Sequence, residues 1–401
     1  MNRPALKNVN TPQKKSDFYP SRAGQASKQI RVLLGMKWYR RHLHEGVAAY
    51  CREQGWLLDS FDYSPDSATS NIWDGLILLH EGVNELHPFF LKKVPIVTLA
   101  MTEQGRMRLP CVGQDHEAIG GMGAGHFLER GFRRLFFCGY RDAISHARFS
   151  GFQREAKKQK AFVREICLPH RTPRTTGSQF ILNWLSSRLL EEKPPFAVMA
   201  AHDLLGVTIL DACRAVGLKS PAQVAVLGVD NEEIICECAQ VPLSSVDNGL
   251  FLQGREAARL LGNLILGAVP PTAPVLIKPE RVIIRSSSDT IAAEEPRLAQ
   301  ILQYLHDRIH SPEVNVKEVS GRFGLTRRVL GQLFARAKLK PPMEVIHEIR
   351  LRHACHHLEE SFVSINEVAT KCGFSSARSF CRFFRKMQGC SPEAWRQATK
   401  A

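Results

Sequence analysis

The 401-residue sequence contains no run approaching the roughly eighteen consecutive apolar residues that a membrane-spanning helix requires. Its first 28 residues are polar and lack the apolar core, about 7–15 residues long, of a secretory signal peptide. The 11 cysteines form no Cys-x-x-Cys pair, which argues against a secreted disulfide framework. Neither a Gly-x-Ser-x-Gly elbow nor a His-Glu-x-x-His motif is present. We therefore expect a cytoplasmic protein with reduced thiols, no membrane contact and no enzymatic activity.

Acidic residues are scarce relative to basic ones, with 39 against 54, for a net charge of +15. The excess lies at the two ends of the chain. Residues 296–401 hold 18 basic and 9 acidic residues, and residues 1–28 hold 6 and 1, whereas the segment between them is nearly neutral. We expect 1–28 to be a disordered tail. A basic block of this kind indicates a polyanionic partner, because lysine and arginine gain free energy by displacing counterions from phosphate.

The nearly neutral body, residues 29–287, alternates short apolar runs with amphipathic stretches. The runs that predict buried strands are 30–35, 75–79, 94–98, 135–138, 196–200 and 224–229. Helical patterns at 40–54 and 117–130 follow two of the apolar segments. Strands that alternate with helices predict a parallel sheet covered on both faces, and such sheets bind ligands at the carboxyl ends of their strands. We expect an α/β domain of two lobes with a cleft between them.

Polar and aromatic side chains follow several of these strands or begin the next helix. They are Trp38, Tyr39, Asp115, Arg148, His202 and Asp230. Carboxylates accept hydrogen bonds from sugar hydroxyls, arginine donates them, and aromatic rings stack on the apolar face of a sugar. This set of residues predicts a sugar site. The alternative for each single residue is a helix cap or an ordinary loop position, since Asp and Asn are favoured caps whatever the function.

Four segments of the body carry a family resemblance: 114–140, 147–152, 201–206 and 227–231, the last continuing to 242–246. In order and spacing they resemble the periplasmic-binding-protein-like sensor domain of the lactose/galactose-repressor (LacI/GalR) family. The resemblance implies that an effector is bound by Asp115, Arg148, His202 and Asp230, with Asn248 as a weaker addition. The family usually has Asn where His202 stands, and its N-terminal helix-turn-helix is missing here, so DNA binding is expected elsewhere in the chain.

The basic block, residues 296–401, contains two similar units about 50 residues apart, after a small polar linker at 288–295. The first unit is a short helix at 316–323, Gly324 and a second helix from Thr326 to Lys338. The second repeats the pattern at 364–372, Gly373 and 375–387, and 343–358 reads as a connecting helix. A helix stopped by glycine and followed by a capped second helix is the pattern of a helix-turn-helix. Two such units can enter adjacent major grooves.

Six outward-facing polar residues of the second helices are predicted to contact DNA. They are Arg327, Arg328 and Gln332 in the first unit, and Arg378, Ser379 and Arg382 in the second. Arginine can bind guanine through two hydrogen bonds, and serine can reach bases or phosphate. The alternative is a solvated helix face. Residues 373–376, 389–392 and 395–396, with Phe380 and Phe384, resemble the arabinose-regulator (AraC) type of DNA-binding domain. That resemblance implies a double-stranded DNA operator, a homodimer and contact with RNA polymerase.

Two further patterns point to structure rather than chemistry. The glycine-rich run 121–125 lies inside a predicted helix, not at a strand-helix turn, so it predicts close helix packing rather than a nucleotide-binding loop. His353, Cys355, His356, His357 and Cys372 do not match a familiar zinc spacing. We therefore expect neither a metal nor a cofactor.

The fold class predicted is a two-lobed, periplasmic-binding-protein-like α/β sensor domain followed by an all-α domain with two helix-turn-helix motifs. A sensor domain followed by a DNA-binding domain of this type, here called the DNA reader, is similar to regulators of pentose operons. That resemblance implies a sugar-responsive activator of carbohydrate catabolism, with a pentose such as xylose as effector. Three alternatives stay open: a regulator that responds to a different small molecule, a carbohydrate-acting enzyme with an autoregulatory DNA-binding block, and a nucleoid-type structural protein.

Overall fold

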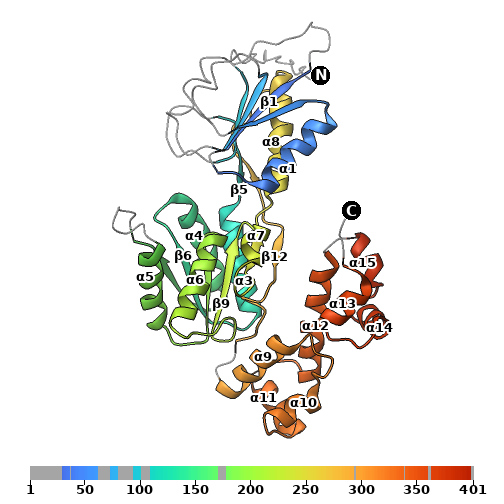
Figure 1. Cartoon of the computed structure of the whole chain (residues 1–401). Helices are drawn as coiled ribbons and strands as arrows, with labels where there is room; N and C mark the ends of the chain where they lie inside the picture. The colour runs from blue at the N-terminus through green and yellow to red at the C-terminus, as the bar shows by residue number, and fades with distance from the viewer. Residues whose placement is uncertain are drawn as a thin grey trace, which may run out of the picture. The chain divides into compact units, whose positions relative to one another are not determined.

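The computed structural model describes residues 29–36, 38–61, 73–79, 94–100, 109–169, 178–292, 295–337, 339–359 and 363–398, so the predicted tail 1–28 lies outside the described residues. The chain divides into two units (Figure 1). The first unit runs to Asp115 and includes Gly249–Lys278. The second holds an α/β part, residues 116–248 and 279–292, which we call the second lobe, and the helices of 295–398, which we call the helical block. No described helix has the length and apolarity needed to cross a membrane.

The first unit is built on a parallel four-stranded sheet of order β2-β1-β3-β4. These strands are β1 (Arg31–Met36), β2 (Leu57–Phe61), β3 (Gly75–Leu79) and β4 (Ile96–Thr98). Helices α1 (Arg41–Glu53) and α8 (Leu250–Ile265) pack against one another and form one core with β1, in which Leu43 and Val47 of α1 meet Val32 and Leu34. A separate pair, β5 (Val112–Gln114) and β11 (Val275–Ile277), runs parallel beside it.

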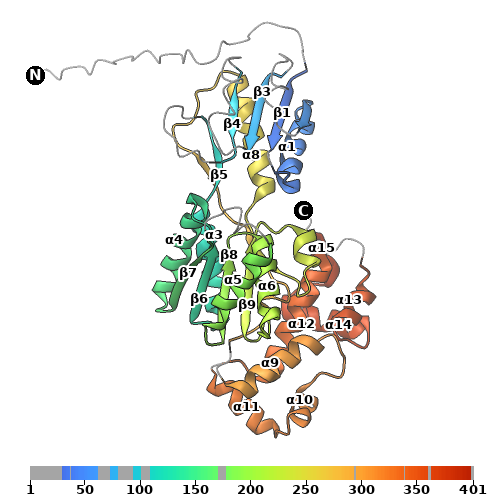
Figure 2. The same ribbon diagram turned by 60° about the vertical axis from the view of Figure 1, so that its left-hand side comes forward.

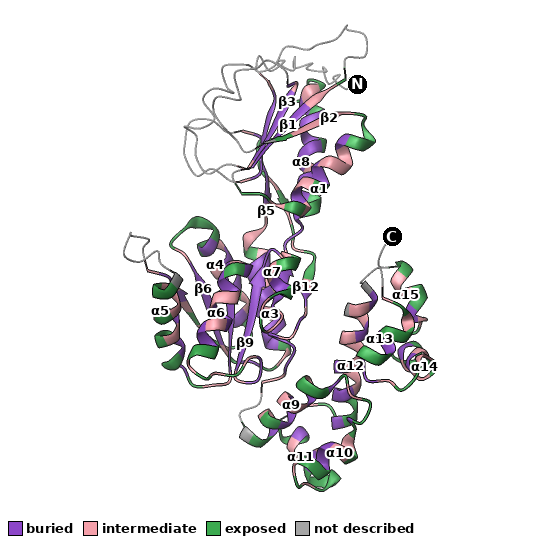
Figure 3. Cartoon of the chain, in the orientation of Figure 1, coloured by how far each residue is buried: buried purple, intermediate pink, exposed green. Residues whose placement is uncertain are grey.

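The second lobe contains a six-stranded sheet of order β12-β10-β9-β8-β6-β7. Its strands are β6 (Arg134–Gly139), β7 (Phe162–Cys167), β8 (Phe196–Ala200), β9 (Val224–Val229), β10 (Ser244–Asp247) and β12 (Arg281–Ile283). All pairs are parallel except β10 with β12. Every residue of β8 and β9 is buried, as Figure 3 shows in purple for β9, because the strands are covered on both faces. This explains their uninterrupted apolar sequences.

Two pairs of helices cover the faces of this sheet (Figure 1). They are α3 (His116–Glu129) with α4 (Ala143–Lys158), and α5 (Ser178–Leu190) with α6 (Asp203–Ala215). Helices α3 and α4 approach so closely that a Cβ atom on Gly120 would lie 1.8 Å from the carbonyl oxygen of Arg148. The run 121–125 lies within α3, and Gly123 packs on Met199. The run lies inside a helix, as predicted, but the close helix-helix contact is made by Gly120 just before the run, and Gly123 packs against the sheet.

The helical block consists of two groups of helices with one long helix between them (Figure 2), and each group encloses an apolar cluster to which the long helix contributes. The first cluster joins α9 (Pro296–Arg308), α10 (Val316–Arg322) and α11 (Arg327–Arg336). The second joins α13 (Ile365–Lys371), α14 (Ala377–Gln388) and α15 (Pro392–Ala398). Helix α12 (Pro342–Glu359) contributes Val345, Ile346 and Ile349 to the first cluster and Ala354 and Leu358 to the second.

The segment that leads from β12 to the helical block is buried where the structure describes it. Ser287, Ser288, Asp289 and Thr290 are all buried. The backbone N–H of Ser287 donates to the carbonyl of Pro242, and the Ser288 hydroxyl lies 2.7 Å from Nε2 of His126 in α3. The small polar residues read as a linker are therefore fixed to the second lobe by hydrogen bonds.

Candidate functional site

Three of the predicted effector residues meet at the carboxyl end of the sheet in the second lobe. Arg148 comes from α4, Asp230 follows β9, and Asn248 follows β10. All three are buried. The Asn248 amide Nδ2 donates to Oδ1 of Asp230 at 2.7 Å, and Nη2 of Arg148 lies 3.9 Å from the same oxygen. We call Arg148, Asp230 and Asn248 the effector cluster.

Arg148 is held in place by partners on both sides of its guanidinium. Nη1 donates to the carbonyl oxygen of Ala201, and Nε donates to Nδ1 of His116 at 3.4 Å. The close packing of α3 and α4 brings the start of α3 and the middle of α4 together. A buried charge needs an ionic partner and hydrogen bonds, and Arg148 has both.

Asp230 lies at the start of a strained turn. Its φ is 108° and that of Asn231 is 52°, values that residues other than glycine rarely adopt. Three hydrogen bonds hold the turn: Asp230 N–H to the Val246 carbonyl at 3.1 Å, Asn231 N–H to Oγ of Ser245 at 3.0 Å, and Glu232 N–H to Oδ2 of Asp203 at 2.8 Å. Backbone strain of this kind persists only where the surrounding structure fixes it, and it clusters at ligand sites.

His202 has a structural role in addition to its predicted one. It is the N-cap of α6, where Nδ1 accepts a hydrogen bond from Leu205 N–H at 3.2 Å. The ring stacks on Tyr140, with centroids 5.6 Å apart and planes 9° apart, and Nε2 lies 3.1 Å from the Tyr140 hydroxyl. The stacked pair follows β6 and β8 and joins the effector cluster through Ala201, the residue before His202 and the acceptor of Arg148.

The remaining predicted effector residues belong to the first unit. Trp38 and Tyr39 follow β1 and are 64% and 68% exposed. The Tyr39 hydroxyl lies 3.3 Å from Nδ1 of His44. Asp115 follows β5 and donates its backbone N–H to the carbonyl of Ile277 at 2.8 Å. Each residue stands at a strand end, as predicted, and the assignment of all seven to the effector stays a prediction.

Two residues of the second lobe that we did not assign from the sequence belong with the effector cluster. Asp203 is buried, accepts from the Ser245 hydroxyl at 2.6 Å and supports the turn of Asp230. Burial, together with the nearby Asp230 carboxylate, raises the pKa of Asp203 to about 7. Tyr140 stacks on His202. Asp203 directly follows the predicted residue His202, and Tyr140 directly follows strand β6, and this adjacency was the available signal.

The first helix-turn-helix is α10 and α11, joined by a glycine turn. Gly324 has φ +60°, and Thr326 caps α11 by accepting from Val329 N–H at 3.2 Å. Leu330 and Phe334 face the core. The three predicted DNA contacts of this unit, Arg327, Arg328 and Gln332, are exposed.

The second helix-turn-helix, α13 and α14, has the same construction. Gly373 has φ +73°, and Ser376 caps α14 by accepting from Ser379 N–H at 3.3 Å. Phe380 and Phe384 are fully buried. Arg378 and Arg382 are exposed, whereas the Ser379 hydroxyl donates to the carbonyl of Ser376 at 2.7 Å. Ser379 is therefore engaged in the helix cap as well as being a predicted DNA contact.

Arg350 of α12 ties the two helix-turn-helix units together. Its Nη2 donates to the carbonyls of Ser311 and Val314 at 3.0 and 3.1 Å, beside the first unit. The same guanidinium lies over the ring of Phe374 in the second unit, 5.5 Å from its centroid. A shared helix and this bridging side chain fix the two units to one another, as two readers of neighbouring grooves require.

Comparison with known proteins agrees with both parts of this description. Residues 124–288 match the periplasmic binding protein-like domain, and residues 319–398 match a helix-turn-helix domain. The xylose operon regulatory protein of Haemophilus influenzae is 26% identical over 377 residues, which cover 90% of this chain and 95% of the relative. Its counterpart in Escherichia coli K12 is 26% identical over 390 residues, covering 92% and 97%.

Solved structures share the fold. One described as a xylose-binding transcription activator covers 93% of this chain and 99% of its own, with a TM-score of 0.70 and 24% identity. A lactose-repressor-type regulator from Alkaliphilus metalliredigens, complexed with D-xylulofuranose, covers 65% and 100%, with a TM-score of 0.53 and 16% identity. The predicted fold class is confirmed, and so is the resemblance to both regulator families. The relatives are transcription regulators rather than enzymes, which leaves the enzyme alternative without support.

Proposed function

We propose that this chain, a DNA-binding transcription regulator of the arabinose-regulator type with a periplasmic-binding-protein-like domain, switches carbohydrate genes in response to a pentose, with D-xylose as the first candidate. The observation that supports a sugar most directly is the effector cluster, where a buried guanidinium, carboxylate and amide meet at the carboxyl ends of parallel strands. The names of the relatives support xylose in particular.

The chemistry of the effector cluster suits a polyhydroxylated ligand. Arg148 offers donors, Asp230 offers acceptors and Asn248 offers both, so that each sugar hydroxyl can donate and accept at once. Asp115, Trp38 and Tyr39 are proposed as further contacts, since carboxylates and aromatic rings bind sugars in the same way. We propose that residues 29–287 form the sensor and residues 296–401 the DNA reader.

A thermal-shift screen of the purified protein against D-xylose, L-arabinose, D-ribose and D-glucose tests the proposed effector. A sugar that binds only the folded state raises the melting temperature by mass action. We expect a selective rise with one pentose, and D-xylose first. A rise with a hexose alone would replace the pentose by a different effector, and no rise with any sugar would contradict a sugar effector.

Replacing Asp230 tests the cluster itself. Asp230→Ala removes a charged acceptor, and hydrogen bonds to charged groups contribute about 1.5–3 kcal/mol, so we expect sugar binding roughly 10- to 100-fold weaker by calorimetry. Asp211→Ala is the matched control, because Asp211 lies in the same lobe with its side chain 41% exposed and paired only with Arg214 among the described residues. Wild-type affinity in Asp230→Ala would show that the effector cluster is not the sugar site.

We further propose that the regulator works in the cytoplasm as a homodimer on a repeated double-stranded DNA operator and contacts RNA polymerase to activate transcription. Support comes from the two helix-turn-helix units and from the description of a similar structure as an activator. Sedimentation of the protein with operator DNA tests the dimer. Two chains per operator are expected, and a single chain on the full operator would contradict it.

A further inference from the structure

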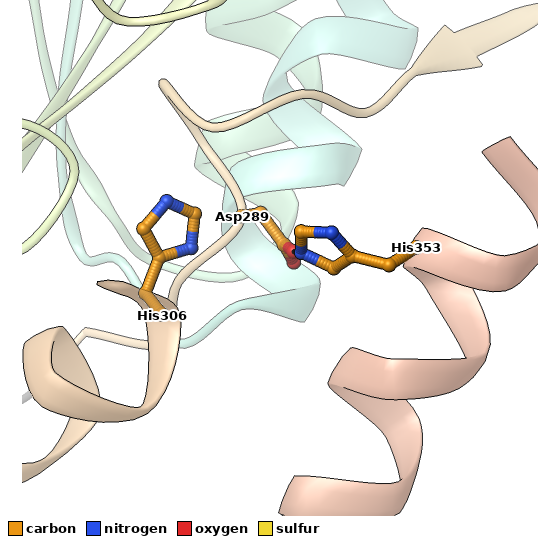
Figure 4. Close-up of side chains that lie close together, drawn as sticks. All are labelled: Asp289, His306 and His353. Atoms are coloured by element: carbon orange, nitrogen blue, oxygen red, sulfur yellow. Dashed lines mark ion pairs between the residues drawn. The ribbon is translucent and has the colours of Figure 1, made fainter. Parts of the chain in front are cut away.

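Three metal-ligating side chains meet where the sensor's chain enters the helical block (Figure 4). Asp289 lies in the segment after β12, His306 lies in α9 and His353 lies in α12. One ligand atom from each residue can be chosen so that all three lie within 4.8 Å of one another. Nε2 of His353 is 3.6 Å from Oδ2 of Asp289, close to the spacing of about 3.3 Å that two ligands of a tetrahedral zinc ion adopt.

The donor atoms have the chemistry that a borderline transition metal prefers. Nδ1 of His306 and Nε2 of His353 are buried and have no hydrogen-bond partner among the described residues. A buried imidazole nitrogen that makes no hydrogen bond can direct its lone pair to an ion. Two imidazole nitrogens and one carboxylate oxygen match sites for zinc or cobalt, whereas magnesium and calcium prefer all-oxygen sites.

Arg352 holds the Asp289 carboxylate in a suitable orientation. Its Nε and Nη2 lie 2.7 and 2.5 Å from Oδ1, which leaves Oδ2 facing His353. This ion pair favours the charged form of a buried carboxyl, which is the form that binds a metal ion. An outer partner on the second oxygen is typical of ligating carboxylates.

Positive charge around the three residues limits the affinity to be expected. Arg352 and Arg130 both interact with Asp289, which is the one carboxylate among the three proposed ligands. Three protein ligands also leave the fourth position of a tetrahedral ion to water. The site should therefore bind more weakly than a closed four-ligand structural zinc site.

We propose that Asp289, His306 and His353 bind one divalent transition-metal ion of the zinc type. The ion would join three segments: the segment that hydrogen bonds fix to the second lobe through Ser287 and Ser288, helix α9, and helix α12. It would thus fasten the DNA reader to the sensor at a point remote in sequence from the effector cluster. The proposal does not depend on the identity of the effector.

The test uses full-length protein without an affinity tag, treated with a chelator and then titrated with Co²⁺. We expect one equivalent to bind with visible ligand-field absorption of a four-coordinate site, and Zn²⁺ to displace it. His306→Ala and His353→Ala should each lose at least tenfold in Co²⁺ affinity. His310→Ala, which removes an exposed imidazole just beyond α9, is the matched control and should bind as wild type does.

A melting curve gives a second readout that does not depend on colour. Zn²⁺ should raise the melting temperature of the wild type and of His310→Ala but not of the two site variants, and Mg²⁺ should have no effect. Circular dichroism of each variant checks its fold, and either site variant suffices if the other does not fold. No saturable Co²⁺ binding, unchanged binding in a folded site variant, or a thiolate-to-cobalt charge-transfer band would overturn the proposal.

Discussion

Asp203 is the buried carboxylate that holds the turn of Asp230 in place. It accepts hydrogen bonds from Glu232 N–H and from the Ser245 hydroxyl, and the Cys236 thiol and the Asp230 carboxylate also interact with it. Burial is the main cause that raises its pKa from 3.8 to about 7, and repulsion from Asp230 adds to it. The folded protein therefore holds a proton on this carboxyl that the unfolded chain releases near pH 4.

This proton makes stability depend on pH. Below about pH 4 the carboxyl is protonated in both the folded and the unfolded state. Between about pH 4 and 7 only the folded state binds the proton. The contribution of Asp203 to the free energy of unfolding therefore falls as pH rises and is lost above about pH 7. The Asp203→Asn side chain cannot titrate. Between pH 5 and 8 the free energy of unfolding of this variant, measured with urea, should therefore fall less than that of the wild type. Asp211→Asn, on the same helix, should follow wild type, and parallel curves for wild type and Asp203→Asn would refute the assignment.

The sequence could identify single residues where a strand end determines their position. Asp230 was predicted in this way. Arg148 was expected to begin a helix but lies in the middle of α4, and the structure brings the two side chains together. Asp203 could not be separated from an ordinary cap, because its burial depends on contacts with Ser245 and Glu232. Of the histidines and cysteines first weighed as metal ligands, only His353 belongs to the proposed metal site. Its companions come from distant segments that local spacing cannot connect.

At the scale of elements, the buried strands were the most predictable part of the fold. Segments 75–79, 196–200 and 224–229 have the predicted limits, because strands covered on both faces read as continuous apolar runs. Edge strands were missed. In β7 buried and exposed positions mix, and β11 and β12 are three residues long, so only their pairing with β6, β5 and β10 defines them.

The glycines between α3 and α4 make a prediction about packing. Gly120→Ala would place a Cβ against the Arg148 carbonyl, so the helices must move apart, and overpacking of this kind costs about 1–3 kcal/mol. Gly125→Ala is the control in the same helix, since nothing lies within 4 Å of its added Cβ and alanine favours a helix by up to about 1 kcal/mol. In urea unfolding, Gly120→Ala should lower the free energy of unfolding and Gly125→Ala should raise it. Equal changes in the two variants would contradict the packing account.

The exposed face of α14 makes a prediction about DNA. Arg382→Ala should weaken binding to the specific operator by about 1–3 kcal/mol if Arg382 contacts a base, and should change binding to random DNA far less. Arg308→Ala removes an exposed arginine of α9, which is outside the two helix-turn-helix units, and is the charge control. Fluorescence anisotropy with operator DNA and with random DNA gives the two dissociation constants, and their ratio measures specificity. An equal loss on specific and random DNA would reduce Arg382 to a phosphate contact.

For the whole molecule, the account requires that the sensor and the reader share one equilibrium. A sugar that binds one conformation better than another shifts the population, and by linkage DNA must then change the affinity for the sugar by the same factor. The buried segment 287–290 is the covalent route between the effector cluster's lobe and the helical block. A nucleoid-type structural protein, which ignores small molecules, would show no such coupling.

The most direct measurement is the operator affinity of the wild type and of Asp230→Ala, at a fixed salt concentration, without D-xylose and with D-xylose at a concentration that saturates the wild type but lies well below the dissociation constant of Asp230→Ala. We expect xylose to change the wild-type dissociation constant by at least fivefold and to leave that of Asp230→Ala unchanged, with equal basal affinity in both proteins. Two results would contradict the claim that the effector cluster controls DNA binding. One is a wild-type operator affinity that neither xylose nor another pentose changes, and the other is an equal change of operator affinity in Asp230→Ala.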